Sequence, residues 1–261
     1  MSRQVRSEFV KALTGRAWWV VGLVLVIVAP ALSAFLVVAV RAAPNARLDL
    51  SGADGVGVLY NLPASVAFVL PLVFGVVLVT GEYHSRTIVQ TFLGEPRRLV
   101  VFAAKLLVAF TMTFALALGT MALTTAVVAV TLHAGGTDPA LATSAVQSRV
   151  GGAVITLTIW GLIVVGIGAL VRNQLVAVVA VLAFTQFIEP MIRIGAGSLG
   201  FGGVLDVLPG SASDSASGGT LLSMATGTSG TSQMTGIAVL IAYAVVSAVV
   251  GGLRFRRSMP A

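Results

Sequence analysis

The chain has no cysteine, which excludes disulfide bonds, thiolate catalysis and cysteine-ligated metal sites. Charged residues are also scarce, at 10% of the 261 residues, whereas soluble domains carry about 25%. Hydrophobic residues make up 57% of the chain. A soluble core of this size cannot cover so much apolar surface, so we expect the lipid bilayer to be the solvent for most of the chain.

Lysine is nearly absent, and neither Lys11 nor Lys105 lies in a Gly-x-x-x-x-Gly-Lys phosphate-binding loop. The sequence therefore lacks a nucleotide site of that kind, and we expect the chain itself to be no enzyme. The two histidines, His84 and His133, fall on opposite sides of the membrane in a six-span topology, so they cannot share a metal ion. We expect no catalytic residue, no metal site and no cofactor bound by this chain.

Six long apolar runs approach or exceed the roughly 20 residues that a membrane-spanning helix needs. They cover residues 17–40, 57–80, 100–132, 150–171, 174–189 and 236–253. The third is longer than a bilayer requires, and only Arg172-Asn173-Gln174 separates the fourth from the fifth, which predicts a tight turn. The sequence thus predicts an all-α membrane protein, a single transmembrane domain over residues 1–261 with six transmembrane helices.

Basic residues gather on one side of this topology. Six spans place both termini on the same side, and of the 16 Lys and Arg residues only Arg41, Arg47, Arg149 and Arg193 fall on the other. The positive-inside rule then places both termini in the cytoplasm. The net charge of +7 is explained by these span ends and by anionic membrane lipid, not by nucleic acid. Abundant Arg, Ala, Val and Gly are typical of a GC-rich bacterial genome, so we expect the bacterial plasma membrane.

Residues 81–98 form a polar island between two apolar runs, and its ionised groups cannot remain in hydrocarbon. The stretch from Glu82 to Leu93 can form a short amphipathic helix, which Gly94-Glu95-Pro96 then ends because proline cannot continue a helix interior. Arg97 and Arg98 mark the return to the headgroup layer. The simpler alternative is an ordinary loop, but an amphipathic helix held parallel to the membrane suits docking onto a cytoplasmic protein.

Residues 1–16 predict a second amphipathic helix. Within Ser2–Thr14 the apolar positions Val5, Phe9, Ala12 and Leu13 share one face, with Arg3, Arg6 and Lys11 off that face. Trp18 and Trp19 follow where an aromatic belt would lie. We expect an interfacial helix in the cytoplasmic headgroup layer, the alternative being a charged tail that only fixes topology.

The segment 190–235 before the last span is the longest expected external region. It ends in a low-complexity Ser/Gly/Thr stretch from residue 209, and its apolar pieces at 198–208 and 220–225 are too short to span. These pieces form either external half-helices or part of a flexible loop. Glu189 precedes this segment beside Pro190, and it is a candidate for an interfacial cap or an external gate. We expect no carboxylate deep within a span.

Several of these motifs together resemble type-2 ABC transporter permeases. They are Glu82-Tyr83-x-x-x-Thr87-Ile88, then Pro96-Arg97-Arg98 and Ala104-Lys105-Leu106, and the segment Arg6–Lys11 before Trp18-Trp19. The resemblance implies that residues 82–93 are a coupling helix between spans two and three. Contacts with a cytoplasmic ABC ATPase would then come from Glu82, Tyr83, His84, Arg86, Thr87, Ile88 and Phe92. His84 and Arg86 depart from the Arg and Gly common in that family.

The resemblance implies the permease subunit of an ATP-driven exporter, paired with a second permease subunit in a homodimer or heterodimer. ATP and magnesium would be bound by the partner ATPase subunits. The uncharged spans favour an apolar or amphiphilic substrate such as a lipid, a drug or a natural product. Two alternatives stay open: a non-transporting sensor or resistance scaffold that recruits a cytoplasmic partner, and an ion-coupled secondary carrier.

The expected orientation can be tested by labelling, because a chain without cysteine gives no background. A membrane-impermeant maleimide should label Ser85→Cys only in inside-out vesicles and Thr137→Cys only in intact cells, since the two positions lie on opposite sides. Labelling of Ser85→Cys in intact cells would contradict the orientation.

Overall fold

A computed structural model describes residues 2–43, 52–66, 69–84, 97–171, 173–198, 202–220 and 231–257. Every regular element in these ranges is a helix. Five of the described helices are long and apolar enough to cross a membrane: Gly22–Ala42, Arg98–Ala134, Ser144–Val171, Gln174–Ala196 and Gln233–Arg256. These are the helices of an all-α, multi-pass membrane protein.

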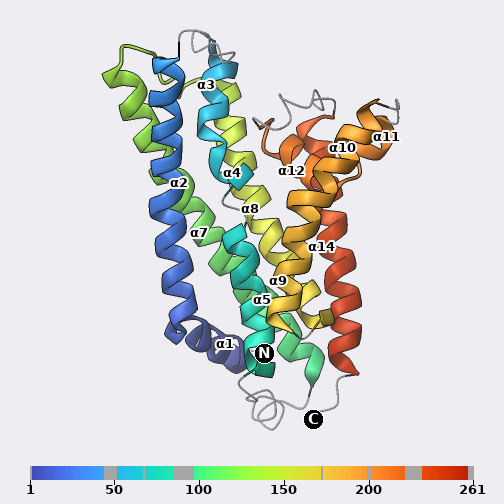
Figure 1. Cartoon of the computed structure of the whole chain (residues 1–261). Helices are drawn as coiled ribbons and strands as arrows, with labels where there is room; N and C mark the ends of the chain where they lie inside the picture. The colour runs from blue at the N-terminus through green and yellow to red at the C-terminus, as the bar shows by residue number, and fades with distance from the viewer. Residues whose placement is uncertain are drawn as a thin grey trace.

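The helices form a bundle with both chain ends at one pole (Figure 1). Helix α1 (Ser2–Thr14) lies across this pole, α2 (Arg16–Ala42) leads away from it, and α7 (Arg98–Ala134) and α8 (Ser144–Val171) run in opposite directions. The remaining helices are α3 (Ala53–Tyr60), α4 (Leu62–Val66), α5 (Val69–His84), α9 (Gln174–Ala183), α10 (Glu189–Ser198), α11 (Gly202–Leu205), α12 (Pro209–Ala216) and α14 (Gln233–Arg256), with a π-helical turn at Phe184–Ile188.

Helix α8 is the centre of the bundle, and it packs against α14, α7 and α5. Glycine permits the close approach of these helices. A Cβ atom at Gly166 of α8 would collide with the backbone of Ser247 on α14, and one at Gly75 of α5 would lie 2.7 Å from the Gly161 carbonyl oxygen of α8. In a bilayer, where apolar burial drives little association between helices, such small-residue contacts hold helices together by close van der Waals packing.

The expected second span, residues 57–80, is not one helix in the structure. It comprises the end of α3, all of α4 and most of α5, and the helix is interrupted at Asn61 between α3 and α4. Pro63 explains the interruption, because its nitrogen cannot donate a hydrogen bond to the Leu59 carbonyl. The uninterrupted apolar part of this region is the shorter helix Pro71–Gly81.

The expected fifth span is longer than its predicted boundary at residue 189. Helices α9 and α10 are continuous through the π-helical turn, so the apolar helix extends from Gln174 to Ala196. Pro190 causes this π-helical turn and does not end the helix. Its nitrogen carries no hydrogen and cannot bond to the Gln186 carbonyl. The helix widens instead, and the Glu189 N–H donates to the Phe184 carbonyl, five residues back.

Two other predictions agree with the structure. Helix α7 has 37 residues, so it is roughly 55 Å long at 1.5 Å per residue, well beyond the roughly 30 Å of bilayer hydrocarbon. Helix α8 ends at Val171 and α9 begins at Gln174, as a tight turn requires, and Asn173 caps α9 by accepting a hydrogen bond from Val176 N at 3.2 Å.

A pair of glycine substitutions tests the packing around α8. Gly166→Ala should lower the unfolding free energy by about 1–3 kcal/mol, because the new methyl group forces α8 and α14 apart. Gly119→Ala on α7 is the matched control, since a Cβ atom there meets nothing within 4 Å. Thermal unfolding of the detergent-purified protein measures both, and equal melting temperatures for the two variants would disprove the close contact.

Candidate functional site

Helix α12 is buried inside the bundle, although its sequence lies in the low-complexity part of the segment 190–235, for which external half-helices and a flexible loop were both open. Its residues Ser211, Ala212, Ser213, Asp214 and Ala216 are all buried, and the helix packs against α14 and α8. Glycine again permits the approach, since a Cβ atom at Gly152 of α8 or at Gly236 of α14 would collide with the α12 backbone or closely approach it. The small side chains therefore build a packed helix rather than a flexible loop.

The N-terminus of α12 is capped by Glu189, the first residue of α10. Gly210 N donates to Glu189 Oε2 at 2.9 Å, and Ser211 N donates to Glu189 Oε1 at 2.8 Å. The first N–H groups of a helix have no partner within the helix, and a carboxylate also complements the positive end of the helix dipole. Glu189 is fully buried, so this contact replaces water for both groups.

The opposite end of α12 is capped by two side-chain amides. Asn61 Nδ2, from the break between α3 and α4, donates to the carbonyl oxygens of Ser217 at 2.9 Å and Gly219 at 2.6 Å. Gln233 Nε2, at the start of α14, donates to the Ala216 carbonyl at 2.9 Å. The interruption at Asn61 therefore has a structural use, because it brings an amide to the carbonyl end of α12.

A buried ion network fixes α12 to α10. Arg193 Nη2 lies 2.7 Å from Glu189 Oε1, and Arg193 Nη1 lies 2.6 Å from Asp214 Oδ2. Thr220 donates its hydroxyl to Asp214 Oδ1 at 2.8 Å. Burial raises the pKa of Asp214, while the Arg193 guanidinium and the Thr220 hydroxyl act in the opposite direction.

This network corrects the expectation that no carboxylate lies deep within a span, because Glu189 lies inside the apolar helix Gln174–Ala196. Both Glu189 and Asp214 are enclosed, with relative exposures of 0% and 9%. Glu189 also lies inside a continuous helix rather than at the end of a span. Its observed contacts, two N–H donors and one guanidinium, are those of a helix cap and an ion pair.

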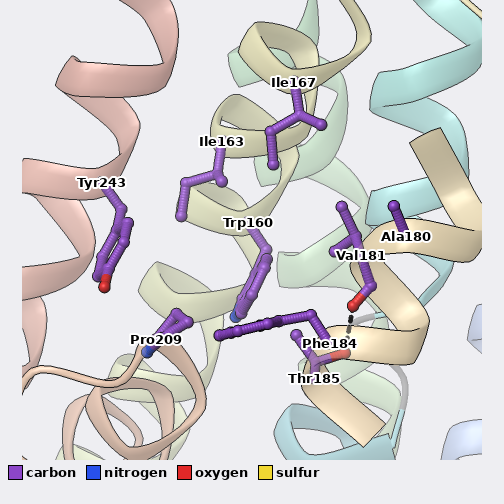
Figure 2. A pocket seen from close by; sticks show the side chains of 9 residues that line it. All are labelled: Trp160, Ile163, Ile167, Ala180, Val181, Phe184, Thr185, Pro209 and Tyr243. Atoms are coloured by element: carbon purple, nitrogen blue, oxygen red, sulfur yellow. Dashed lines mark hydrogen bonds between the residues drawn. The ribbon is translucent and has the colours of Figure 1, made fainter. Parts of the chain in front are cut away.

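A pocket of about 270 Å³ lies beside the start of α12. Its wall combines α8, the α9 helix with its π-helical turn, α12 and α14 (Figure 2). Tyr243 of α14 faces Phe184 and Thr185 across the pocket, with Trp160 of α8 between them. The other lining residues are Ile163, Ile167, Ala180, Val181 and Pro209. The pocket is thus an apolar chamber that requires four separate segments of the chain.

A second buried ion pair lies at the pole that holds both termini. Lys105 Nζ of α7 lies 2.6 Å from Glu8 Oε2 of α1 and donates to the Leu78 carbonyl of α5 at 3.3 Å. Lys11 lies 2.9 Å from the other Glu8 oxygen. Apolar contacts of Phe9 and Ala12 with Phe74 of α5 and with α7 complete the attachment. One lysine therefore joins three helices.

The structure places the predicted contact residues at this same pole only in part. Glu82, Tyr83 and His84 form the last turn of α5, whereas Arg86, Thr87, Ile88 and Phe92 lie outside the described residues. Trp18 and Trp19 begin α2, and their side chains are not among those described. Arg6 is exposed on α1, Arg97 is exposed before α7, and Arg98 donates to the Arg256 carbonyl at 3.1 Å.

The sequence alone did not indicate that four residues hold helices together through caps and ion pairs: Lys105, Asn61, Arg193 and Asp214. A signal existed for two of them, because Lys105 is the lone charge in an apolar run and Asn61 is a lone amide in another. Polar groups at membrane depth are costly unless paired. Their partners come from distant segments, so the pairings themselves could not be read from the chain. Among the described residues, no cluster of three or more His, Asp or Glu side chains could hold a metal ion.

Comparison with known proteins adds no assignment: no protein-family model matches the chain, and no significant match is found among curated proteins.

Replacing Glu189 tests the capping arrangement. Glu189→Gln should lower the unfolding free energy by about 1–3 kcal/mol, because it removes one of the two carboxylates paired with Arg193 and weakens the cap of α12. Asp206→Asn is the control, since Asp206 is an exposed carboxylate on the approach to α12. Chemical or thermal unfolding in detergent measures both, and an unchanged Glu189→Gln protein would show that the cap contributes little.

Proposed function

We propose that this chain is the membrane-spanning permease subunit of an ATP-driven ABC exporter in a bacterial plasma membrane. One observation carries the proposal: α5 ends at His84 and α7 begins at Arg98, both at the pole where α1 and the two chain ends lie (Figure 1). The polar segment 81–98 therefore connects the two helices at the arginine-rich pole, which the positive-inside rule assigns to the cytoplasm. A coupling helix for an ATPase subunit needs this position.

The attachment of α1 supports a mechanical role for this pole. Because Lys105 bonds to both Glu8 and the Leu78 carbonyl, a force applied below α5 reaches α7 and α1 without a flexible intermediate. In the proposed assembly, two permease subunits, identical or related, form the pathway and two ATPase subunits dock beneath them. Six spans, with α3, α4 and α5 together forming the second, place both termini on the ATPase side, and the segment containing α11 and α12 precedes the last span.

The buried carboxylates do not favour an ion-coupled carrier instead. A proton-coupling carboxylate must exchange its proton and its partner during transport. Glu189 is held by two backbone N–H groups and Arg193, and Asp214 by Arg193 and Thr220. These contacts support a structural role, so the energy for transport has to come from a partner. The apolar pocket supports an apolar or amphiphilic substrate.

A substitution in the last turn of α5, where the expected coupling segment begins, tests the function. In proteoliposomes containing the partner ATPase, Tyr83→Ala should lower transport per ATP hydrolysed by at least about tenfold, because removing a buried aromatic contact costs several times RT. Tyr83→Phe is the matched control and should retain most transport, since it keeps the ring. Membrane abundance should be equal for both variants. Full ATP-dependent transport in Tyr83→Ala, or no ATPase recovered with the chain in mild detergent, would overturn the proposal.

A further inference from the structure

Every polar side-chain group that lines the apolar pocket bonds to the protein and not into the pocket. Trp160 Nε1 donates to Ser213 Oγ at 2.7 Å, and the Tyr243 hydroxyl donates to the Val207 carbonyl at 3.1 Å. Thr185 donates to the Val181 carbonyl at 2.9 Å, the bond drawn in Figure 2. An occupant of the pocket therefore meets carbon surfaces on all sides.

This chemistry decides what can fill the space. A buried water needs two to four polar partners, and the pocket side chains direct theirs elsewhere. An empty pocket would forfeit the dispersion contacts of its lining. A cavity of about 150 Å³ with an apolar lining holds one benzene ring, and this pocket, at about 270 Å³, is nearly twice as large. The space therefore suits hydrocarbon, with room for several methylene groups.

The pocket is accessible from the side of the bundle. Its rim residues Phe184 and Tyr243 are each 36% exposed. Next to them, Phe187 on the π-helical turn and Val246 on α14 are 71% and 60% exposed. In a membrane-spanning chain such apolar outward faces lie against hydrocarbon. The π-helical turn that Pro190 imposes begins at Phe184, whose ring lies close to Trp160 and Pro209 in the pocket (Figure 2).

We propose that the pocket between α8, the π-helical turn, α12 and α14 binds one hydrocarbon chain that enters sideways from the membrane. The chain belongs either to a bilayer lipid or to the amphiphile that the permease exports, and the second source rests on the proposed function. An inserted chain contacts Pro209, the first residue of α12, and Trp160, which bonds to Ser213 on the same helix. Occupancy is therefore sensed by the helix that Glu189 caps.

Fluorescence of Trp160 tests the proposal. The chain has three tryptophans, so Trp18→Phe and Trp19→Phe together leave Trp160 as the only reporter, and it is only 3% exposed. The protein is placed in phosphatidylcholine nanodiscs without ATPase or nucleotide. One arm raises the mole fraction of phosphatidylcholine brominated on its acyl chains, and the other adds a bromoalkyl phosphocholine amphiphile. Bromine quenches the indole only at close contact, so a bound chain should give saturable quenching.

Narrowing the pocket should abolish the signal. Thr185→Phe places a ring in the pocket and should weaken the apparent affinity at least about tenfold. Thr111→Phe is its matched control: Thr111 is also half-buried on a helix and bonds back to the Leu107 carbonyl at 3.0 Å, but it lies on α7 away from the pocket. If Thr185→Phe is not recovered as a monodisperse protein, Ile167→Phe narrows the pocket from α8.

The two arms distinguish the sources of the chain. Saturable quenching by brominated lipid alone identifies a bilayer lipid, and saturable quenching by the bromoalkyl amphiphile in nanodiscs of unbrominated lipid identifies the exported class; both support the proposal. Quenching that does not saturate, or that is equal in the Thr185→Phe and Thr111→Phe proteins, overturns it. The measurement needs no ATP, so a failure of coupled transport leaves this result standing, and a failure here leaves coupled transport untouched.

Discussion

The constraint on which the structure depends is that backbone polar groups buried away from water must find partners inside the protein. Helix α12 has only eight residues, and a helix this short leaves about half of its N–H and C=O groups without intrahelical bonds. Glu189 supplies the acceptor at one end, and Asn61 and Gln233 supply donors at the other. These three side chains therefore allow a short helix to be buried between longer ones.

The same constraint explains why charge is concentrated where it is. A carboxylate that caps α12 would be costly alone in a low-dielectric interior, so Arg193 pairs with it, and Asp214 shares the same guanidinium. The network therefore stabilises one position of α12 relative to α10. The apolar pocket begins at Pro209, directly before the capped residues, so its shape depends on this network although no ion lines it.

At the other pole, side-chain contacts attach the surface helix α1 to the bundle. Lys105 joins α1 and α5 to α7 through one ammonium group, and Arg98 ties the start of α7 to the end of α14. A rigid pole of this kind suits the proposed permease, in which an ATPase acts on the segment between α5 and α7. The two poles are linked by α8, whose glycines allow its neighbours to touch its backbone.

Local chemistry was enough to predict much of this protein. Apolar runs, scarce charge and the absence of cysteine predicted an all-helical membrane protein, and the helical spacing of Val5, Phe9 and Ala12 predicted α1. Composition left half-helices and a flexible loop open for the segment 190–235, and Pro190 suggested the end of a span, whereas the structure has a buried helix at Pro209–Ala216 and a π-helical turn at Phe184–Ile188.

These features were decided by tertiary structure, because their partners are distant in sequence. Asn61 meets Ser217 and Lys105 meets Glu8 only after the helices pack. Sequence periodicity reports which face of a helix is apolar. It carries no information about which remote side chain will bond to the unpaired N–H and C=O groups at the end of a helix. Those partners determine whether a helix as short as α12 is stable inside the protein.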